Sequence, residues 1–168
     1  MLKEIELRKS YRNFSDKEIV DEIIKDIIEA GRLAPSCFNK QPCHFILLKK
    51  PKNEKIFPFI NKGNSWAKNA YAYVVMACDP DSACVVHGMN YFLLDCGLAV
   101  ENMLLNAYYH GLIAHSIAGF DEIGVKKSLN IPENYRVPVI IVIGYPEGKE
   151  IRERERKSLR EILHEGEW

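Results

Sequence analysis

The chain has 168 residues, of which 47% are hydrophobic and 27% are charged, a balance typical of a globular protein with a sizeable core. Its 23 basic and 23 acidic residues give a formal net charge of zero, so no global field attracts nucleic acid or an anionic membrane. We therefore predict one domain over residues 1–168, with neither nucleic acid nor a membrane as partner. A charged ligand would have to be bound by a local cluster.

The N-terminus and the cysteines both favour a cytoplasmic protein. The N-terminus, Met-Leu-Lys-Glu-Ile-Glu, lacks the basic and then apolar organisation of a signal peptide. The cysteines are odd in number and scattered, with no Cys-x-x-Cys, which predicts reduced thiols. Cys78 and Cys96 lie in apolar surroundings and are predicted to be core residues. Cys37 and Cys43 lie in a loop, and whether either acts near a ligand is left open.

The first part of the chain predicts two helices. Residues 2–8 favour a short helix, and Ser15-Asp16-Lys17-Glu18 matches a capping box at the start of a second one. Isoleucine and valine then recur every four residues over 19–28, which gives one apolar stripe. Gly31 and Pro35 are expected to end this helix.

Residues 33–45 predict a stiff loop between that helix and a strand. Pro35 and Pro42 restrict the backbone, and between them Ser36, Asn39 and Gln41 offer hydrogen-bonding groups. Such a loop is suited to recognising a flat polar molecule. It can equally be an ordinary polar connection, and the loop alone does not decide between the two.

The rest of the chain mixes strands and helices. Apolar runs predict strands over 44–50, 71–78, 112–118 and 137–145, the last β-branched throughout as in a central strand. The longest helical pattern covers 82–110 with Gly111 as its stop, and it is apolar on most of its circumference. Asp121 is expected to cap a helix reaching Leu129, and 158–163 to form a last helical turn. The class predicted is α+β, a mixed or antiparallel central sheet flanked by helices, with the long helix buried in a core, a subunit interface or both.

Most common catalytic motifs are missing, whereas two basic clusters stand out. There is no glycine-rich nucleotide motif, no Gly-x-Ser-x-Gly, no His-Glu-x-x-His and no Cys/His spacing suited to zinc. Arg8, Lys9 and Arg12, with Ser10 between them, form a compact anion site, because guanidinium groups match phosphate. The second cluster spans 152–160, and taken alone it is better explained as a solvated, ion-paired surface.

Several segments, in order, resemble the FMN-dependent nitroreductase family. Arg8-Lys9-Ser10-Tyr11-Arg12-x-Phe14 is similar to its Arg-Arg-Ser-x-Arg-x-Phe opening. Ala34-Pro35-Ser36-Cys37-Phe38-Asn39-Lys40-Gln41-Pro42 resembles its Ala-Pro-Ser-x-x-Asn-x-Gln-Pro loop. Further similarities are Asp95-Cys96-Gly97-Leu98-Ala99-Val100-Glu101-Asn102, Ala118-Gly119-Phe120-Asp121, Leu129-x-Ile131-Pro132, Gly144-Tyr145-Pro146 and Arg154-x-Arg156. They span nearly the whole chain, which would be a short member of the family.

The resemblance implies a homodimeric nitroreductase-like fold with FMN at the subunit interface. Arg8, Lys9, Ser10 and Arg12 would hold the ribityl phosphate and the pyrimidine edge, and Arg154 and Arg156 would close on the phosphate. Pro35, Ser36, Asn39 and Gln41 belong to the loop that would reach the flavin from the partner subunit. The backbone of Ala118 and Gly119 would face flavin N5. No catalytic side chain and no metal are expected, because the flavin supplies the reaction chemistry.

The function expected from the resemblance is that of an oxidoreductase. It would take hydride from NAD(P)H and reduce a nitroaromatic, a quinone or a similar small acceptor by a ping-pong mechanism. One alternative is a flavin store or sensor without efficient turnover. Another is a general phosphate or nucleotide binder built on the segment Arg8–Arg12. The acceptor and the preference between NADH and NADPH are not fixed by the sequence.

Overall fold

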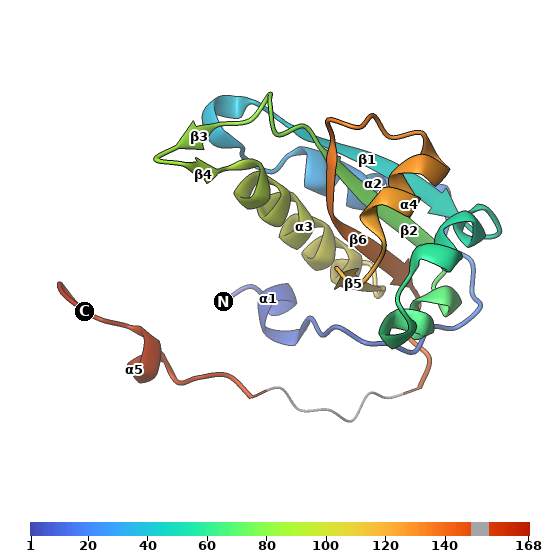
Figure 1. The fold of residues 1–168 in the computed structure, drawn as a ribbon. Coiled ribbons are helices and arrows are strands. Elements are labelled where there is room, and N and C mark those ends of the chain that lie inside the picture. The colour runs from blue at the N-terminus through green and yellow to red at the C-terminus, as the bar shows by residue number, and fades with distance from the viewer. Residues whose placement is uncertain (149–154) are drawn as a thin grey trace.

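A four-stranded antiparallel sheet lies at the centre of the molecule (Figure 1). The structure is a computed structural model and describes residues 1–148 and 155–168. The strands are β1 (Cys43–Lys49), β2 (Ala72–Cys78), β5 (Ile113–Ile117) and β6 (Arg136–Gly144), in the spatial order β1-β2-β6-β5. Each neighbouring pair is antiparallel, which confirms the predicted class of sheet.

Helices cover both faces of the sheet and so give the fold two apolar layers. On one face lie α2 (Asp21–Arg32) and α3 (Phe92–Tyr109), and on the other lie α4 (Glu122–Leu129) and the 3-10 segments η2 (Lys52–Phe59) and η3 (Lys62–Asn69). The remaining elements are α1 (Lys3–Leu7), η1 (Cys37–Asn39), β3 (Val85–Val86), β4 (Met89–Asn90) and α5 (Leu159–Ile162). None of the described helices is long and apolar enough to cross a membrane.

Strand β2 has an apolar residue at every position, and β6 has one at every position after Arg136, because both sides of these central strands are covered. Val74 and Met76 of β2 face the layer of α2 and α3, whereas Tyr73 and Val75 face the opposite layer. All seven residues of β2 are buried. Successive side chains of a strand point to opposite faces, so a strand between two layers cannot alternate apolar and polar residues.

The predicted start of the second helix is wrong. Helix α2 begins at Asp21 with Val20 as its N-cap, and no side chain caps it. Phe14 instead forms a β-bridge with Pro146, and the Ser15 N–H donates to the Tyr145 carbonyl at 3.0 Å. This pairing directs the chain away from a helix, and because residues 16–20 are not helical, Ser15 is not at a helix start and the capping box does not form.

Gly31 was expected to stop this helix, and it lies inside it instead. The residue is buried in the last turn of α2. A Cβ atom at this position would lie 2.8 Å from Met103 Cγ and 3.1 Å from Phe45 Cε1. Gly31 is therefore a packing position that lets α2 approach α3 and the sheet closely.

The long helix starts ten residues later than predicted, because a hairpin precedes it. The β3–β4 hairpin turns through His87 and Gly88, whose φ angles are 50° and 77°. Two consecutive positive φ values in a two-residue loop are typical of a type I′ turn. The predicted ends of the later helices are confirmed, with Gly111 at φ 71° after α3 and the Asp121 carboxylate capping α4 at the Ile123 N–H.

Helix α3 buries one apolar face and exposes another. Met103 and Ala107 are fully buried against the sheet and α2. Leu93, Leu94 and Leu98 are 56%, 53% and 38% exposed, respectively. Within the described residues, only part of the apolar circumference expected from the sequence is covered.

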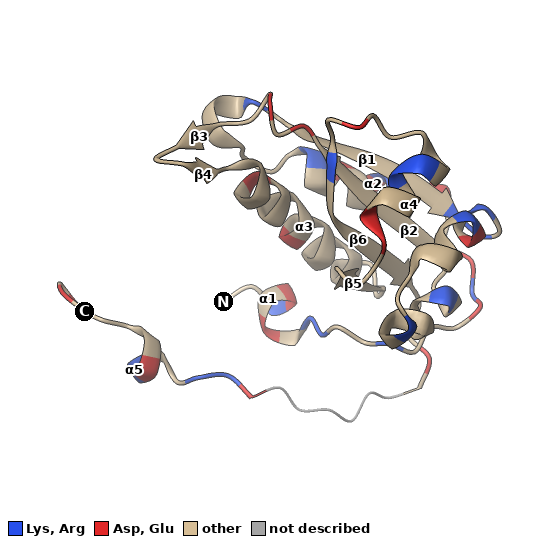
Figure 2. Ribbon diagram, viewed as in Figure 1, with Lys and Arg blue, Asp and Glu red and all other residues tan. Residues whose placement is uncertain are grey.

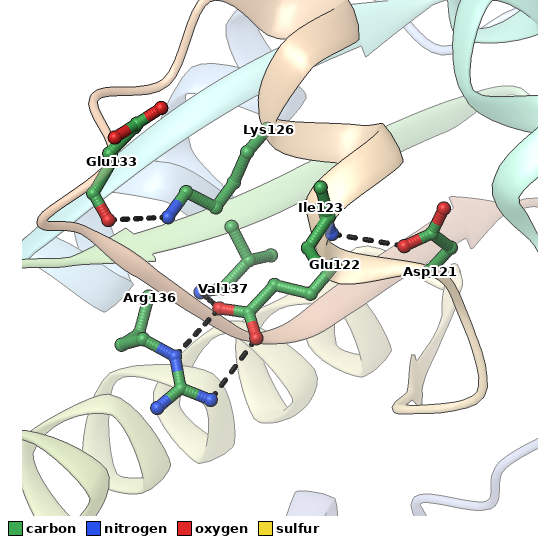
Figure 3. A network of polar contacts seen from close by, with 7 residues as sticks. All are labelled: Asp121, Glu122, Ile123, Lys126, Glu133, Arg136 and Val137. Carbon is green, nitrogen blue, oxygen red and sulfur yellow. Dashed lines mark hydrogen bonds and ion pairs between the residues drawn. The ribbon is translucent and has the colours of Figure 1, made fainter.

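A polar network fixes α4 to the start of β6 (Figure 3). One oxygen of the Glu122 carboxylate accepts from Arg136 Nε at 2.9 Å and from the Val137 N–H at 2.8 Å. The other accepts from Arg136 Nη2 at 3.1 Å. The Arg136 guanidinium, with the Val137 N–H, lowers the pKa of Glu122, and the resulting carboxylate joins the two elements.

Candidate functional site

The N-terminal basic segment lies along α3 and beside η3. Arg8 is largely buried, and its Nε lies 3.4 Å from a Glu101 carboxylate oxygen of α3. The Arg12 guanidinium lies over the Trp66 ring, 5.4 Å from its centroid. Ser10 between them is half-buried. The two arginines are thus oriented by contacts with two different elements before any ligand binds.

Trp66 makes the contacts that join the N-terminal segment to β5, and the sequence analysis did not assign it a role. Its ring lies 4.5 Å from the His115 ring of β5 and 6.2 Å from the Phe14 ring, centroid to centroid. His115 Nδ1 lies 2.8 Å from the Tyr11 carbonyl oxygen. These contacts fix residues 11–14 against the edge strand β5. An aromatic residue inside a polar segment was the only signal in the sequence that could have pointed to this role.

Two buried donors in this region have no hydrogen-bond partner among the described residues. They are Arg8 Nε, whose contact with Glu101 is an ion pair without hydrogen-bond alignment, and Trp66 Nε1. Buried donors are normally satisfied, and leaving one unsatisfied costs on the order of 1–3 kcal/mol. An anionic ligand rich in acceptors, such as a flavin phosphate, fits these donors and the neighbouring Arg12.

The end of β5 lies next to the same 3-10 segment. The Gly119 carbonyl accepts from the Asn61 N–H at 3.1 Å and from Asn64 Nδ2 at 3.2 Å. A Cβ atom on Gly119 would lie 2.6 Å from Asn64 Nδ2, so a larger residue would push η3 away. Ala118, directly before it, is exposed. Through η3 the structure brings the Ala118–Gly119 backbone and Arg12 to one end of the sheet.

The loop of residues 35–42 is locally strained and held by its own polar groups. Phe38, Asn39 and Gln41 have positive φ values of 47°, 55° and 50°. The Ser36 hydroxyl oxygen accepts from the Gln41 N–H at 2.9 Å, and Gln41 Nε2 donates to the Asn39 carbonyl at 3.1 Å. Non-glycine residues in the left-handed region cost of order 1 kcal/mol or more each and gather at functional sites. Pro35 is exposed in this loop.

An acidic residue of α3 that the sequence did not flag anchors this loop. Asp95 is 4% exposed, and its Oδ1 accepts from the Cys37 N–H at 2.9 Å. Its Oδ2 is buried and has no hydrogen-bond partner within residues 1–148 and 155–168. The contact places the loop at the first turn of α3.

Within one chain, the loop of residues 35–42 and Arg8 contact different parts of α3. Asp95 holds the loop, and Glu101 contacts Arg8 six residues further along the helix. Six residues correspond to about 9 Å along a helix axis. The predicted contribution of Ser36, Asn39 and Gln41 from a partner subunit stays a prediction.

The C-terminal basic residues are not brought to the other cluster. Arg156 is exposed, and its Nη1 donates to the Glu155 carbonyl at 3.2 Å. Residues 155–168 are exposed throughout and lie apart from the sheet and its helices (Figure 2). Arg154 lies outside the described residues. The predicted closure of this cluster on a phosphate also stays a prediction.

One cavity lies beside the N-terminal basic segment and another beside the strained loop. A cavity of about 670 Å³ is lined by Lys9 and Tyr11 together with Leu112 and Ile113 of the β5 region, but not by Arg8, Ser10 or Arg12. A smaller one of about 160 Å³ lies beside the strained loop and is lined by Ser36 and Gln41, among others. Because the larger cavity excludes the two arginines, it does not by itself identify their ligand.

The cysteines differ from the prediction of five reduced thiols. Cys37 and Cys84 form a disulfide that joins the strained loop to the segment before β3, so the prediction is wrong for this pair. Cys78 and Cys96 are buried in the core, as predicted, and Cys43 is half-buried beside them. Hydrogen bonds from the Cys43 and Cys78 thiols lower the pKa of Cys96.

A model of the nitroreductase family matches residues 5–80 and 61–145. The chain belongs to the nitroreductase family. It is 31% identical over 172 residues to an Archaeoglobus fulgidus protein provisionally named NADH dehydrogenase/NAD(P)H nitroreductase, covering 99% of this chain and 98% of that protein. The family resemblance predicted from the motifs is therefore confirmed.

Solved structures of nitroreductase family proteins share the fold. A family protein from Clostridium novyi NT superposes with a TM-score of 0.79 at 31% identity, over 86% of this chain and 83% of that one. The FMN-dependent nitroreductase of Clostridium difficile R20291 superposes over 100% of both chains with a TM-score of 0.85 at 23% identity, a likeness of fold alone. The nitroreductase-like fold predicted for this family member is confirmed.

Proposed function

We propose that this nitroreductase-family protein is an FMN-dependent oxidoreductase. It takes hydride from NAD(P)H and reduces a nitroaromatic, a quinone or a similar small acceptor, with both substrates using the same site in turn. Family membership and the names of the relatives support an oxidoreductase. The observation that carries the choice of cofactor is a pair of buried donors beside the Arg12 guanidinium, Arg8 Nε and Trp66 Nε1, which have no hydrogen-bond partner among residues 1–148 and 155–168.

The residues of this chain would bind and orient the cofactor, whose isoalloxazine ring supplies the hydride chemistry when bound. Arg8, Lys9, Ser10 and Arg12 hold the phosphate and the pyrimidine edge by charge-assisted hydrogen bonds. Positive charge beside the pyrimidine ring stabilises the anionic reduced form. Arg154 and Arg156 approach the phosphate from the C-terminal segment.

The backbone at the end of β5 would set the geometry at the reacting atom. Ala118 and Gly119 direct an N–H group toward flavin N5. Two hydrogen bonds from η3 to the Gly119 carbonyl support this role, because they hold the segment in one conformation. Hydride transfer needs no side-chain nucleophile, which accords with the absence of such a motif in the sequence.

The proposed site is completed by a second copy of the chain in the cytoplasm. The exposed leucines of α3, Leu93, Leu94 and Leu98, form an apolar face that a partner subunit would cover. Ser36, Asn39 and Gln41 of that partner then reach the flavin. Their loop is held in a strained conformation by its own hydrogen bond, and within its own chain it is anchored at Asp95, six residues along α3 from the Glu101 that contacts Arg8.

The proposal is tested by measuring flavin binding and then flavin reduction. Apo-protein is titrated with FMN, and the loaded protein is mixed anaerobically with NADH or NADPH while flavin absorbance is followed. We expect tight binding, rapid bleaching and recovery of the absorbance on addition of a quinone or nitroaromatic. Binding without bleaching would favour a flavin store or sensor, and no selectivity for FMN over ligands without the ring would favour a phosphate binder.

Two arginine variants and one assembly measurement complete the test. Arg12→Ala and Arg156→Ala are each expected to lose flavin during purification. Arg136→Ala, a change of the same type at the distant start of β6, is expected to retain it. Sedimentation is expected to show a dimer, and a flavin-loaded monomer would contradict the shared site.

A further inference from the structure

Three cysteines that come from different elements meet in the core layer beneath α3. Cys43 begins β1, Cys78 ends β2 and Cys96 lies in the second turn of α3. Their three sulfur atoms lie within 4.8 Å of one another, and the Cys43 and Cys78 sulfurs are 2.9 Å apart. We propose that Cys43, Cys78 and Cys96 form a binding site for one copper(I) ion.

The arrangement of the two strands fixes two of the ligands in advance. Cys43 and Cys78 are direct partners in the antiparallel pairing of β1 with β2. The Asp79 N–H donates to the Pro42 carbonyl at 2.9 Å next to them, which makes Cys43 and Cys78 the non-hydrogen-bonded type of pair, with close side chains. Cys96 approaches from α3, so the three sulfurs form a triangle rather than a row.

The number and type of ligands select the ion. Thiolates favour soft ions such as copper(I) and zinc. Structural zinc sites take four ligands, whereas this cluster offers three among the described residues. Three sulfurs about 2.3 Å from a central ion are about 4 Å apart. The three sulfurs here lie within 4.8 Å of one another, and the Cys43 and Cys78 sulfurs, 2.9 Å apart, would have to separate to reach that spacing.

Burial also favours an ion of low charge. Cys78 is 0% and Cys96 2% exposed. Two thiolates and one thiol hold a copper(I) ion at a net charge of −1, and each thiol that becomes a thiolate on binding releases one proton. Three thiolates on the same ion would place a charge of −2 in the core, which is far more costly.

An entry path leads to the site from the surface. Cys43 is half-buried and lines the cavity of about 160 Å³ beside the strained loop. Asp95 lines the same cavity, and its buried Oδ2 has no hydrogen-bond partner in the described part of the chain. A carboxylate in the lining favours the approach of a cation, and Cys43 is the one cluster thiol that lines this cavity.

The test is an anaerobic titration of the full apo-chain with copper(I) against a chromophoric copper(I) chelator, after reduction with a phosphine. We expect one copper(I) per chain and X-ray absorption showing a shell of sulfur alone at about 2.3 Å. Loss of a group that merely orients a ligand costs 10–100-fold in metal affinity, so Cys43→Ala is expected to weaken binding by at least about 100-fold. Cys96→Ala is a second variant with the same expectation.

The double variant Cys37→Ser/Cys84→Ser is the matched control, because it removes the other two thiols and leaves the three-cysteine cluster intact. It is expected to bind copper(I) with unchanged stoichiometry and affinity. Unchanged affinity in Cys43→Ala, a ratio of one ion to two chains, or a preference for zinc(II) would overturn the proposal. So would a Cys43–Cys78 disulfide in the oxidised control together with no copper uptake after reduction. The titration uses neither flavin nor nicotinamide, so its failure is distinct from failure of the proposed function.

Discussion

Gly31 of α2 is packed against Met103 and Phe45, so we expect Gly31→Ala to destabilise the protein, although alanine is the better helix former. In an open helix, replacing glycine by alanine stabilises by about 1 kcal/mol. Here the new Cβ atom would lie 2.8 Å from Met103 Cγ and 2.9 Å from Met103 Sδ, and 3.1 Å from Phe45 Cε1. Met103 is 0% exposed, so its side chain has no solvent into which it can move.

The magnitude follows from the two opposing terms. Overpacking in a dense core costs about 1–3 kcal/mol, which exceeds the gain in helix propensity. We expect a net loss of about 1 kcal/mol, seen as a fall in melting temperature of about 2–4 °C for a chain of this size. Met103→Ala alone is expected to cost about 2–5 kcal/mol, and less in the Gly31→Ala background because the new methyl group fills part of the vacated space.

The assay is denaturant unfolding of the two single variants and the double variant at one protein concentration. Gly63→Ala is the matched control, since no atom lies within 4 Å of the Cβ position there, and it is expected to change stability by no more than about 0.5 kcal/mol. A Gly31→Ala protein more stable than the parent, or additive effects of Gly31→Ala and Met103→Ala, would refute the packing argument.

Three further predictions concern single side chains. Tyr73→Phe removes the hydroxyl that donates to the Ala67 carbonyl at 2.7 Å in the core, and thermal unfolding should show a loss of about 1–2 kcal/mol. Glu122→Gln should cost up to about 1 kcal/mol at pH 7. Because Arg136 lowers the Glu122 pKa in the folded state, this contribution is fully present above the unfolded pKa, about 4.3, and is lost as the pH falls through the lower, folded pKa. A stability difference that did not shrink as the pH was lowered from about 4.3 would contradict this argument. Arg12→Ala should weaken FMN binding about 10- to 150-fold, the equivalent of a charge-assisted hydrogen bond, and an equal loss in Arg136→Ala would contradict a specific contact.

The sheet and the main helices could be predicted because their apolar patterns are set by burial on one or both sides. The continuous run of 137–145 predicted a central strand, and β6 lies between β2 and β5. The wrong boundaries have non-local causes. The capping box at Ser15 is a valid local motif, but pairing of residues 14 and 15 with a segment 130 positions away overrides it. The β3–β4 hairpin was missed because four strand residues give too short a pattern.

The residues of the candidate site also fall into those that a local motif predicts and those whose roles depend on distant contacts. Arg8 and Arg12 were recognisable from their residue type and spacing, since the chemistry of phosphate binding is local to a motif. Trp66 and Asp95 were not, because their roles depend on contacts with residues distant in sequence. Pairing of cysteines likewise depends on the folded chain: Cys37 and Cys84 are 47 positions apart and form a disulfide.

The strand order has a consequence for the order in which the protein can be made. Strand β6 is the last of the sheet to leave the ribosome, yet it is inserted between β2 and β5, and within the described residues β5 pairs with no other strand. A nascent chain that ends before residue 136 therefore has a two-stranded β1–β2 ribbon with an open edge and a β5 segment without a neighbour. Open apolar edges promote pairing between chains, and non-local pairing is slow. The sheet can therefore be completed only after β6 has been synthesised. Until then the chain depends on chaperones or on rapid synthesis to avoid aggregation.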